Sequence, residues 1–138
     1  MKILFVDDSP ARHDFICTRK HKQHGQVHTC TRDNFIIVHA YNVSQARSLL
    51  LESVQRIRQV NSPYLFQLIC LDHDMDPNHD ENNNGVALAT YLAAMETYVR
   101  ADPKIIVHSW NHAGATRMVD ILKHAGYTQV LFNPFAVA

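Results

Sequence analysis

Short apolar runs alternate along the chain with longer segments in which apolar residues recur at helical spacing. Continuous apolar runs are typical of strands covered on both faces, and spacings of three and four residues are typical of amphipathic helices. The pattern predicts strands at 2–7, 35–40, 66–71, 104–108 and 128–132, and helices at 9–16, 44–60, 86–99 and 113–125. The polar, histidine-rich segment 17–34 has no clear period and predicts a loop or an irregular hairpin.

Polar and conformationally special residues mark where these elements begin and end. Ser9 and Pro10 are typical of the N-cap and first position of a helix, and Ser44 offers a cap to the next helix. Asp102-Pro103 separates the third predicted helix from the following strand, and Gly126 suits the position after a helix end. Strands that alternate with helices predict one α/β domain over residues 1–138, with a flavodoxin-like, doubly wound, five-stranded parallel sheet and helices on both faces.

Composition narrows the class of protein and of partner. The chain has 138 residues, 46% of them hydrophobic and 19% charged, with a formal net charge of zero. This is ordinary globular composition, and a neutral chain has no overall field that favours duplex nucleic acid or an anionic membrane as partner. No apolar run reaches the roughly 18 residues of a membrane span. Cys17, Cys30 and Cys70 show no disulfide-framework spacing, so we expect reduced thiols and a cytoplasmic protein.

Three of the predicted strands end in residues that can bind ligands or metals. In open α/β sheets, the carboxyl ends of the parallel strands border one ligand crevice. The residues that close or follow the strands at 2–7, 66–71 and 104–108 are Asp7-Asp8, Asp72-His73-Asp74 and His108-Ser109-Trp110-Asn111-His112. We therefore expect one functional site at that edge of the sheet.

Four carboxylates are expected in this crevice, those of Asp7, Asp8, Asp72 and Asp74. Unpaired, they would repel one another, and a bound divalent cation is the simplest relief. Carboxylate ligands favour Mg²⁺ or Mn²⁺, whereas an added histidine ligand shifts the preference toward Mn²⁺, iron or Zn²⁺. The sequence thus predicts a divalent metal cofactor, Mg²⁺ or Mn²⁺ before Zn²⁺.

Cleavage of a phosphodiester also needs proton transfer and donors for the developing charge. We expect Asp72, His73 and His108 to be catalytic, because imidazoles titrate near neutrality. In an extended chain His73 would point to the face opposite Asp72 and Asp74, so its role requires a turn at residue 73. The residues expected to bind the substrate are Ser109, Asn111, Arg12, Trp110 and Arg117.

These residues also have purely structural interpretations. Asp7-Asp8 could cap the first helix, and Ser109 and Asn111 are typical of turns and caps. His108 could be a hydrogen-bonded core histidine, and Trp110 could cover the core. Their coincidence at the strand ends favours a functional site.

The segment from Cys17 to Cys30 is a second candidate site. It carries five potential zinc ligands at a spacing that matches no standard zinc module: Cys17, His21, His24, His28 and Cys30. It also contains Arg19, Lys20 and Lys22, with Arg32 just beyond it. We favour a basic loop that covers an anionic substrate, and a structural zinc site and a plain solvated loop are the alternatives.

The order of these motifs resembles the response-regulator receiver domain over nearly the whole chain. Asp7-Asp8 matches the acidic pair that helps to hold a divalent cation in that family, Asp72 matches the phospho-accepting aspartate, and Ser109 matches the Ser/Thr after the fourth strand. Asn133-Pro134-Phe135 lies where receivers carry a Lys-Pro-Phe motif. The lysine that neutralises the phosphoryl group is therefore Asn133 here, which argues against an ordinary phosphorylation switch.

Two longer motifs, Leu71-Asp72-His73-Asp74 and His108-Ser109-Trp110-Asn111-His112-Ala113-Gly114-Ala115, are similar to those of the receiver-derived family proposed to process cyclic phosphates. The resemblance implies a metal-dependent phosphodiesterase that acts on a cyclic phosphate or cyclic (oligo)nucleotide, of a kind associated with phages and bacterial conflict systems. Two alternatives stay open: a non-catalytic cyclic-nucleotide sponge or sensor, and a degenerate receiver that acts through a protein partner. The sequence identifies no surface for a homo-oligomer and leaves the oligomeric state open.

Overall fold

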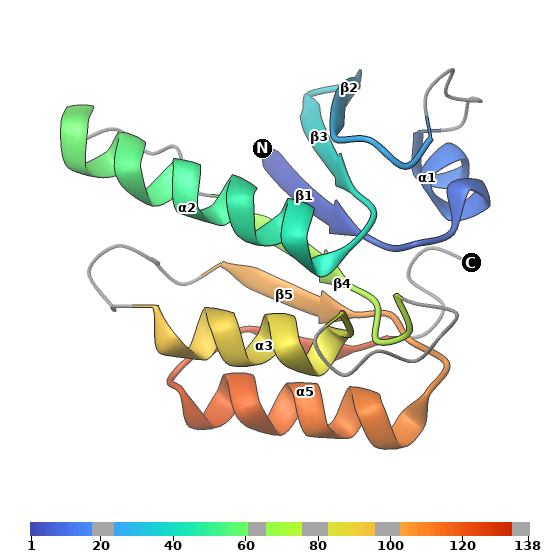
Figure 1. Ribbon diagram of the computed structural model, residues 1–138, viewed down its shortest axis with the longest axis vertical. Helices are drawn as coiled ribbons and strands as arrows, with labels where there is room; N and C mark the ends of the chain where they lie inside the picture. Colours follow the sequence, from blue (N-terminus) through green and yellow to red (C-terminus); the bar gives the residue numbers. More distant parts are fainter. Residues whose placement is uncertain (18–23, 61–65, 76–82, 96–102, 134–138) are drawn as a thin grey trace.

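The chain folds around one six-stranded sheet (Figure 1). A computed structural model describes residues 1–17, 24–60, 66–75, 83–95 and 103–133. The strands are β1 (Lys2–Val6), β2 (His28–Arg32), β3 (Phe35–Ala40), β4 (Leu68–Leu71), β5 (Lys104–Val107) and β6 (Val130–Phe132). The helices are α1 (Pro10–Cys17), α2 (Val43–Val60), α3 (Gly85–Ala94) and α5 (His112–His124).

The strand order is β2-β3-β1-β4-β5-β6. The five strands β3, β1, β4, β5 and β6 are all parallel to one another. Because β1 lies between β3 and β4, the chain order reverses at β1, which is the switch point of a doubly wound sheet. The predicted flavodoxin-like α/β fold is confirmed.

The sheet has six strands where the sequence predicted five. The additional strand, β2, pairs antiparallel with β3 and forms the edge of the sheet. Only Cys30 of its five residues is buried, so β2 shows no apolar run that would reveal it. The turn between β2 and β3 uses Asp33 at φ 54°. The hairpin alternative for segment 17–34 is therefore confirmed at its C-terminal end.

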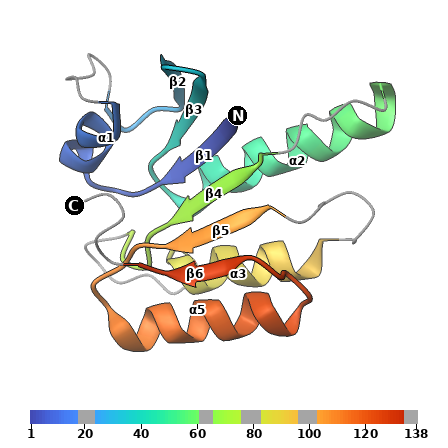
Figure 2. The same cartoon turned by 180° about the vertical axis from the view of Figure 1, so that it is seen from behind.

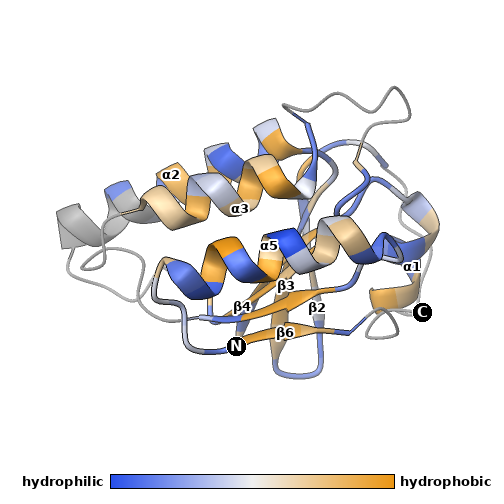
Figure 3. Cartoon of the chain, turned by 90° about the horizontal axis from the view of Figure 1, so that it is seen from below, coloured by the Kyte–Doolittle hydropathy of each residue, from blue (hydrophilic) through white to orange (hydrophobic). Residues whose placement is uncertain are grey.

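Alternate residues of the central strands face two different apolar layers. Leu4 and Val6 of β1 pack in a large layer with apolar residues of α2, α3 and α5. Ile3 and Phe5 face a smaller layer on the other side, which includes Cys17 of α1. Of the described helices, α2, α3 and α5 thus cover one face of the sheet and α1 covers the other (Figure 2). Figure 3 shows polar and apolar residues alternating along α5, as expected for an amphipathic helix on a sheet.

The helix boundaries follow the capping residues. Asn84 caps α3 by accepting from the Ala87 amide at 2.9 Å, and α5 begins directly after Asn111. Gly126 has φ 100° just after α5, as predicted for a residue that ends a helix. The last part of the predicted helix at 86–99 lies outside the described residues. No helix in the described ranges is long and apolar enough to cross a membrane.

Candidate active site

Three neighbouring strands bring the site together. β1, β4 and β5 are adjacent and parallel, so their carboxyl ends lie at one edge of the sheet (Figure 1). Asp7 follows β1, Asp72 follows β4 and His108 follows β5. All three are buried, and their potential ligand atoms lie within 4.8 Å of one another. These residues and Arg12 are called the acidic site below.

Asp7 is held by three donors. Its Oδ1 accepts from the Ser9 amide at 2.8 Å, and its Oδ2 accepts from His108 Nε2 at 2.9 Å and Arg12 Nη1 at 3.1 Å. Burial raises the pKa of Asp7, but the hydrogen bonds from His108 and Ser9 and the neighbouring positive charges outweigh burial, so the net pKa is lowered. Asp7 is therefore a fixed carboxylate, and it also anchors the start of α1.

Asp72 shares the same arginine but titrates differently. Its Oδ1 accepts from the His73 amide at 2.9 Å, and its Oδ2 lies 3.5 Å from Arg12 Nη1. Burial, followed by the charge of Asp7, raises the pKa of Asp72 to about 7 in spite of Arg12. One guanidinium thus serves two buried carboxylates, and the second carboxylate is incompletely neutralised.

The donor set of the acidic site fits a divalent cation. Asp7 and Asp72 offer hard oxygen ligands, and His108 offers a ring nitrogen within the same 4.8 Å. Because His108 Nε2 already donates to Asp7, the two carboxylates are the more accessible ligands. Such a set suits Mg²⁺ or Mn²⁺.

His108 lies behind Asp7 in the core. Its side chain has no exposed surface, and its ring stacks on Phe5 with centroids 5.2 Å apart and 9° between the planes. Its Nδ1 is buried and has no hydrogen-bond partner among the described residues. This is the environment of a core histidine that orients a carboxylate, and its predicted catalytic role stays a prediction.

The chain turns at His73, which meets the condition for that residue to join the site. β4 ends at Leu71, and a bend at His73 precedes a bridge between Asp74 and Asn84. His73 Nδ1 donates to Asp74 Oδ1 at 2.7 Å. With its proton on Nδ1, a neutral His73 presents the lone pair of Nε2 as a base.

Asn111 and Ser109 shape the turn from β5 into α5. Asn111 is the N-cap of α5, because its Oδ1 accepts from the Gly114 amide at 2.9 Å, and its own amide donates to Ser109 Oγ at 3.0 Å. The Asn111 side chain also reaches the His73–Asp74 pair, with its Nδ2 3.4 Å from Asp74 Oδ1. A Cβ at Gly114 would overlap the His73 ring, so a glycine lets α5 approach. The capping interpretation is thus correct, and Asn111 also contacts the site.

The other predicted residues lie at the periphery. Asp8 is an exposed residue, but its carboxyl is partly desolvated. This partial burial, followed by the charge of Asp7, raises the pKa of Asp8. Trp110 is 52% exposed after β5. Arg117 is exposed in the second turn of α5. Any contact of these side chains with a substrate stays a prediction.

Two residues that the sequence did not single out support the site. His13 of α1 is buried, and its Nε2 donates to the Asp7 carbonyl at 2.7 Å. Gly85 begins α3 against the segment after β4, and a Cβ there would overlap the Asp72 carbonyl. Nothing in the sequence separates His13 from the other nine histidines, whereas the Asn-Gly pair at 84–85 indicated only a turn.

The cysteines differ from the sequence expectation. The structure joins Cys17 and Cys30 as a disulfide, whereas reduced thiols were predicted, and only Cys70 is a free, buried cysteine. The spacing of the cysteines along the chain did not predict this pairing. The pairing depends on the position of β2, which brings Cys30 to the end of α1. Of the basic segment, Arg32 donates to the Ile16 carbonyl at 2.8 Å, while residues 18–23, with Arg19, Lys20, His21 and Lys22, lie outside the described residues.

Comparison with known proteins agrees with this architecture. Among solved structures, the Mn²⁺-bound form of response regulator Rcp1 is similar, with a TM-score of 0.57 and 15% sequence identity, covering 96% of this chain and 79% of that chain. At this identity the likeness concerns the fold alone. No curated protein matches the chain. A family model described as the cyclic-phosphate processing receiver domain matches residues 2–124. The chain therefore belongs to the family of cyclic-phosphate processing receiver domains.

Proposed function

We propose that the acidic site hydrolyses the phosphodiester of a cyclic phosphate or cyclic (oligo)nucleotide with the help of a divalent cation. One observation carries the proposal: two buried carboxylates, Asp7 and Asp72, meet at adjacent strand ends and share one guanidinium. The family to which the chain belongs supports a cyclic phosphate as the substrate class.

Asp7 and Asp72 would hold the cation, and the predicted contribution of Asp8 and Asp74 as further ligands stays a prediction. When bound, Mg²⁺ or Mn²⁺ polarises phosphoryl oxygens and lowers the pKa of a bound water. Asp7 is preset for this role, because the Ser9 amide and His108 fix both of its oxygens. His108 acts through Asp7 as a positioning residue.

The His73–Asp74 pair supplies proton transfer in this proposal. Asp74 accepts from His73 Nδ1 at 2.7 Å and so orients the ring, which leaves Nε2 to take a proton from the attacking water. Asn111 donates toward the same Asp74 oxygen and holds the pair against α5. Arg12, whose side chain is 30% exposed, presents a guanidinium to the anionic phosphate.

The test is a mass-spectrometric screen of purified protein against cyclic mono-, di- and oligonucleotides and ribose cyclic phosphates, with Mn²⁺, Mg²⁺ or a chelator. We expect a metal-dependent gain of one water on at least one substrate. The gain should disappear with Asp72→Asn and persist with Asp120→Asn, a matched loss of an exposed carboxylate on α5.

Two other results would overturn the proposal. Recovery of a bound ligand without chemical change would make the protein a binding module, the sponge or sensor alternative. A phosphoryl adduct at Asp72 after incubation with a small phosphodonor would make it a phosphorylatable receiver, in spite of Asn133, which is exposed at the position of the receiver lysine.

A further inference from the structure

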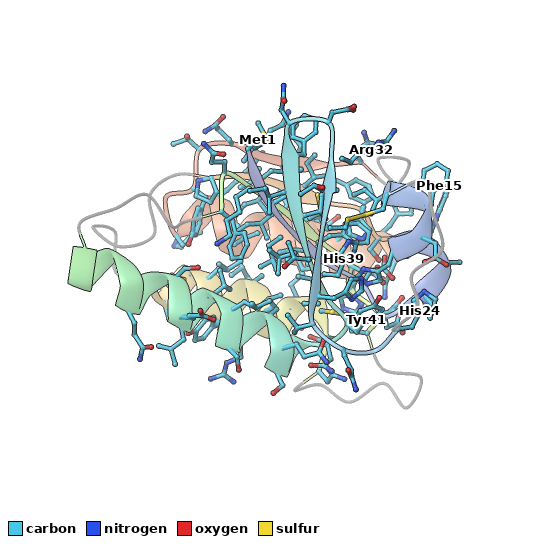
Figure 4. The ribbon with its side chains drawn as sticks, turned by 90° about the horizontal axis from the view of Figure 1, so that it is seen from above. Met1, Phe15, His24, Arg32, His39 and Tyr41 are labelled. Atoms are coloured by element: carbon cyan, nitrogen blue, oxygen red, sulfur yellow. A yellow bond between two sulfur atoms is a disulfide. The ribbon has the colours of Figure 1, made fainter. Side chains whose placement is uncertain are left out.

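A second cluster of potential metal ligands lies apart from the acidic site, between α1 and the β2–β3 hairpin. It consists of Cys17 at the end of α1, Cys30 of β2 and His39 of β3, and all three are buried. His39 Nε2 faces both sulfur atoms, at 3.2 Å from Cys17 Sγ and 3.1 Å from Cys30 Sγ. Figure 4 shows His39 beside the sulfur pair. These residues are called the cysteine cluster below.

A chain of hydrogen bonds determines which nitrogen of His39 carries its proton. The Asp7 carbonyl can only accept, so His13 Nε2, at 2.7 Å, carries a proton and donates to it. Burial disfavours a charged imidazolium, so His13 Nδ1 is an acceptor. His39 Nδ1, at 2.7 Å from His13 Nδ1, must then be the donor. The lone pair of His39 consequently lies on Nε2, toward the two sulfurs.

The arrangement of the three side chains fits a metal ion bound by reduced cysteines. Two sulfurs and one ring nitrogen lie within 4.8 Å of one another, and this donor set is one that Zn²⁺ binds. The Cα atoms of Cys17 and Cys30 are 7.3 Å apart, beyond the range of about 4.4–6.8 Å that is usual for disulfides. A separation of this size leaves room for an ion between the two sulfurs once they are reduced.

We propose that Cys17, Cys30 and His39 form a zinc site when the cysteines are reduced. A dithiol or phosphine reductant supplies the two electrons, the two thiols formed lose their protons, and the thiolates and His39 Nε2 bind the cation. Two sulfurs and one imidazole favour Zn²⁺ over Mg²⁺ or Mn²⁺. His13 then plays the part of the partner that fixes the tautomer of a metal-bound histidine.

The position of the cysteine cluster in the fold indicates a structural role for the bound metal. Among the described residues, the apolar layer on this face of the sheet is small: beside the cluster cysteines, its buried members are Ile3, Phe5, Ile37 and Cys70. A metal shared by α1, β2 and β3 would tie the short helix and the edge hairpin to the sheet. It would also hold α1, and with it Arg12, against Asp7.

Cobalt provides a direct test, because thiolate ligands give a Co²⁺ complex a near-ultraviolet charge-transfer band that oxygen ligands do not give. Fully reduced protein should bind one Co²⁺ per chain with this band, and Zn²⁺ should displace it. Cys30→Ser should lose the band. Cys70→Ser is the matched control and should keep it. Cys70 lies in the same apolar layer but is not among the ligand atoms that meet within 4.8 Å, and burial raises the pKa of its thiol to about 12.

The proposal fails if fully reduced wild-type protein gives no thiolate-to-cobalt band, or if Cys30→Ser keeps the band. It also fails if the Cys17–Cys30 disulfide resists an excess of phosphine under native conditions. Should Cys30→Ser not fold, thermal unfolding of wild-type protein decides the question. Zn²⁺ must then raise the midpoint of the reduced protein by more than that of the oxidised protein, in which, of the two sites described, only the acidic site can bind the ion.

Discussion

The acidic site and the cysteine cluster are linked through Asp7 and His13, yet they are built from opposite chemistry. The side chain of Asp7 belongs to the acidic site, and its carbonyl accepts from His13, which contacts His39 of the cysteine cluster. The acidic site gathers carboxylates, an arginine and a histidine at the carboxyl ends of three strands. The cysteine cluster gathers two sulfurs and one imidazole between α1 and the β2–β3 hairpin.

The difference teaches how one small domain can present two cation preferences. Carboxylate oxygens select hard cations such as Mg²⁺ and Mn²⁺, and thiolates with imidazole select Zn²⁺. Arg12 partly compensates the two carboxylates without a metal, whereas His39 Nε2 faces the two sulfurs. The first arrangement suits reversible loading with cation and substrate, and the second suits a permanent ion.

The largest expected effect separates the two sites by their metals. Asp72→Asn should lower turnover of the identified substrate by about 10³-fold or more and abolish the thermal stabilisation by Mn²⁺, while it leaves the thiolate-to-cobalt band intact. Cys30→Ser should have the reverse effect on the two metals. Differential scanning fluorimetry with each metal measures this, and loss of both responses in either variant would mean that the two sites are one cooperative unit.

The next effect concerns the stability of the metal-free protein. Asp72 titrates near 3.8 when unfolded and at about 7 when folded, so the folded state binds more protons in this window and the free energy of unfolding falls as pH rises through it. Asp72→Asn removes this loss and should be more stable than wild type by about 2–4 kcal/mol at pH 8. The two proteins should converge as the pH falls below 3.8, where Asp72 is protonated in the unfolded state as well. Urea unfolding with a chelator present measures the difference, and a less stable variant at pH 8 would contradict the assigned titration.

His108 separates an orienting role from a catalytic one. His108→Ala removes the donor to Asp7 and the stacking on Phe5, and should destabilise the fold by about 3 kcal/mol. His108→Gln can keep a donor to Asp7. Substantial activity in His108→Gln would show that His108 orients Asp7, and inactivity of a folded His108→Gln would support proton transfer by His108 itself.

The smallest effect tests whether Asn111 does more than cap a helix. Asn111→Ala and Asn84→Ala each remove an N-cap and should each lower stability by about 1 kcal/mol. Asn84 pairs with Asp74 through the backbone, whereas the side chain of Asn111 reaches the Asp74 carboxylate. Of the two variants, only Asn111→Ala should therefore reduce the turnover number. Equal turnover numbers in the two variants would limit Asn111 to capping.

Much of the fold could be predicted because its signals are local. The five parallel strands are apolar runs, and both faces of the central β1, β4 and β5 are covered. Asn, Gly and Pro residues mark the boundaries of the elements. β2 could not be predicted in this way, because an edge strand with one buried residue has no apolar run. The strand-end motifs likewise indicated the acidic site, since parallel strands bring their carboxyl ends to one edge.

The sequence by itself determined the doubly wound architecture and the meeting of Asp7, Asp72 and His108. Only the tertiary structure decided the partners: that one arginine serves both carboxylates, that His108 is buried behind Asp7, and that a bend turns His73 toward Asp74. It alone brought Cys30 and His39 to Cys17. The physical reason is that strand ends converge by topology, whereas hydrogen-bond partners depend on side-chain directions and on packing between residues distant in the chain.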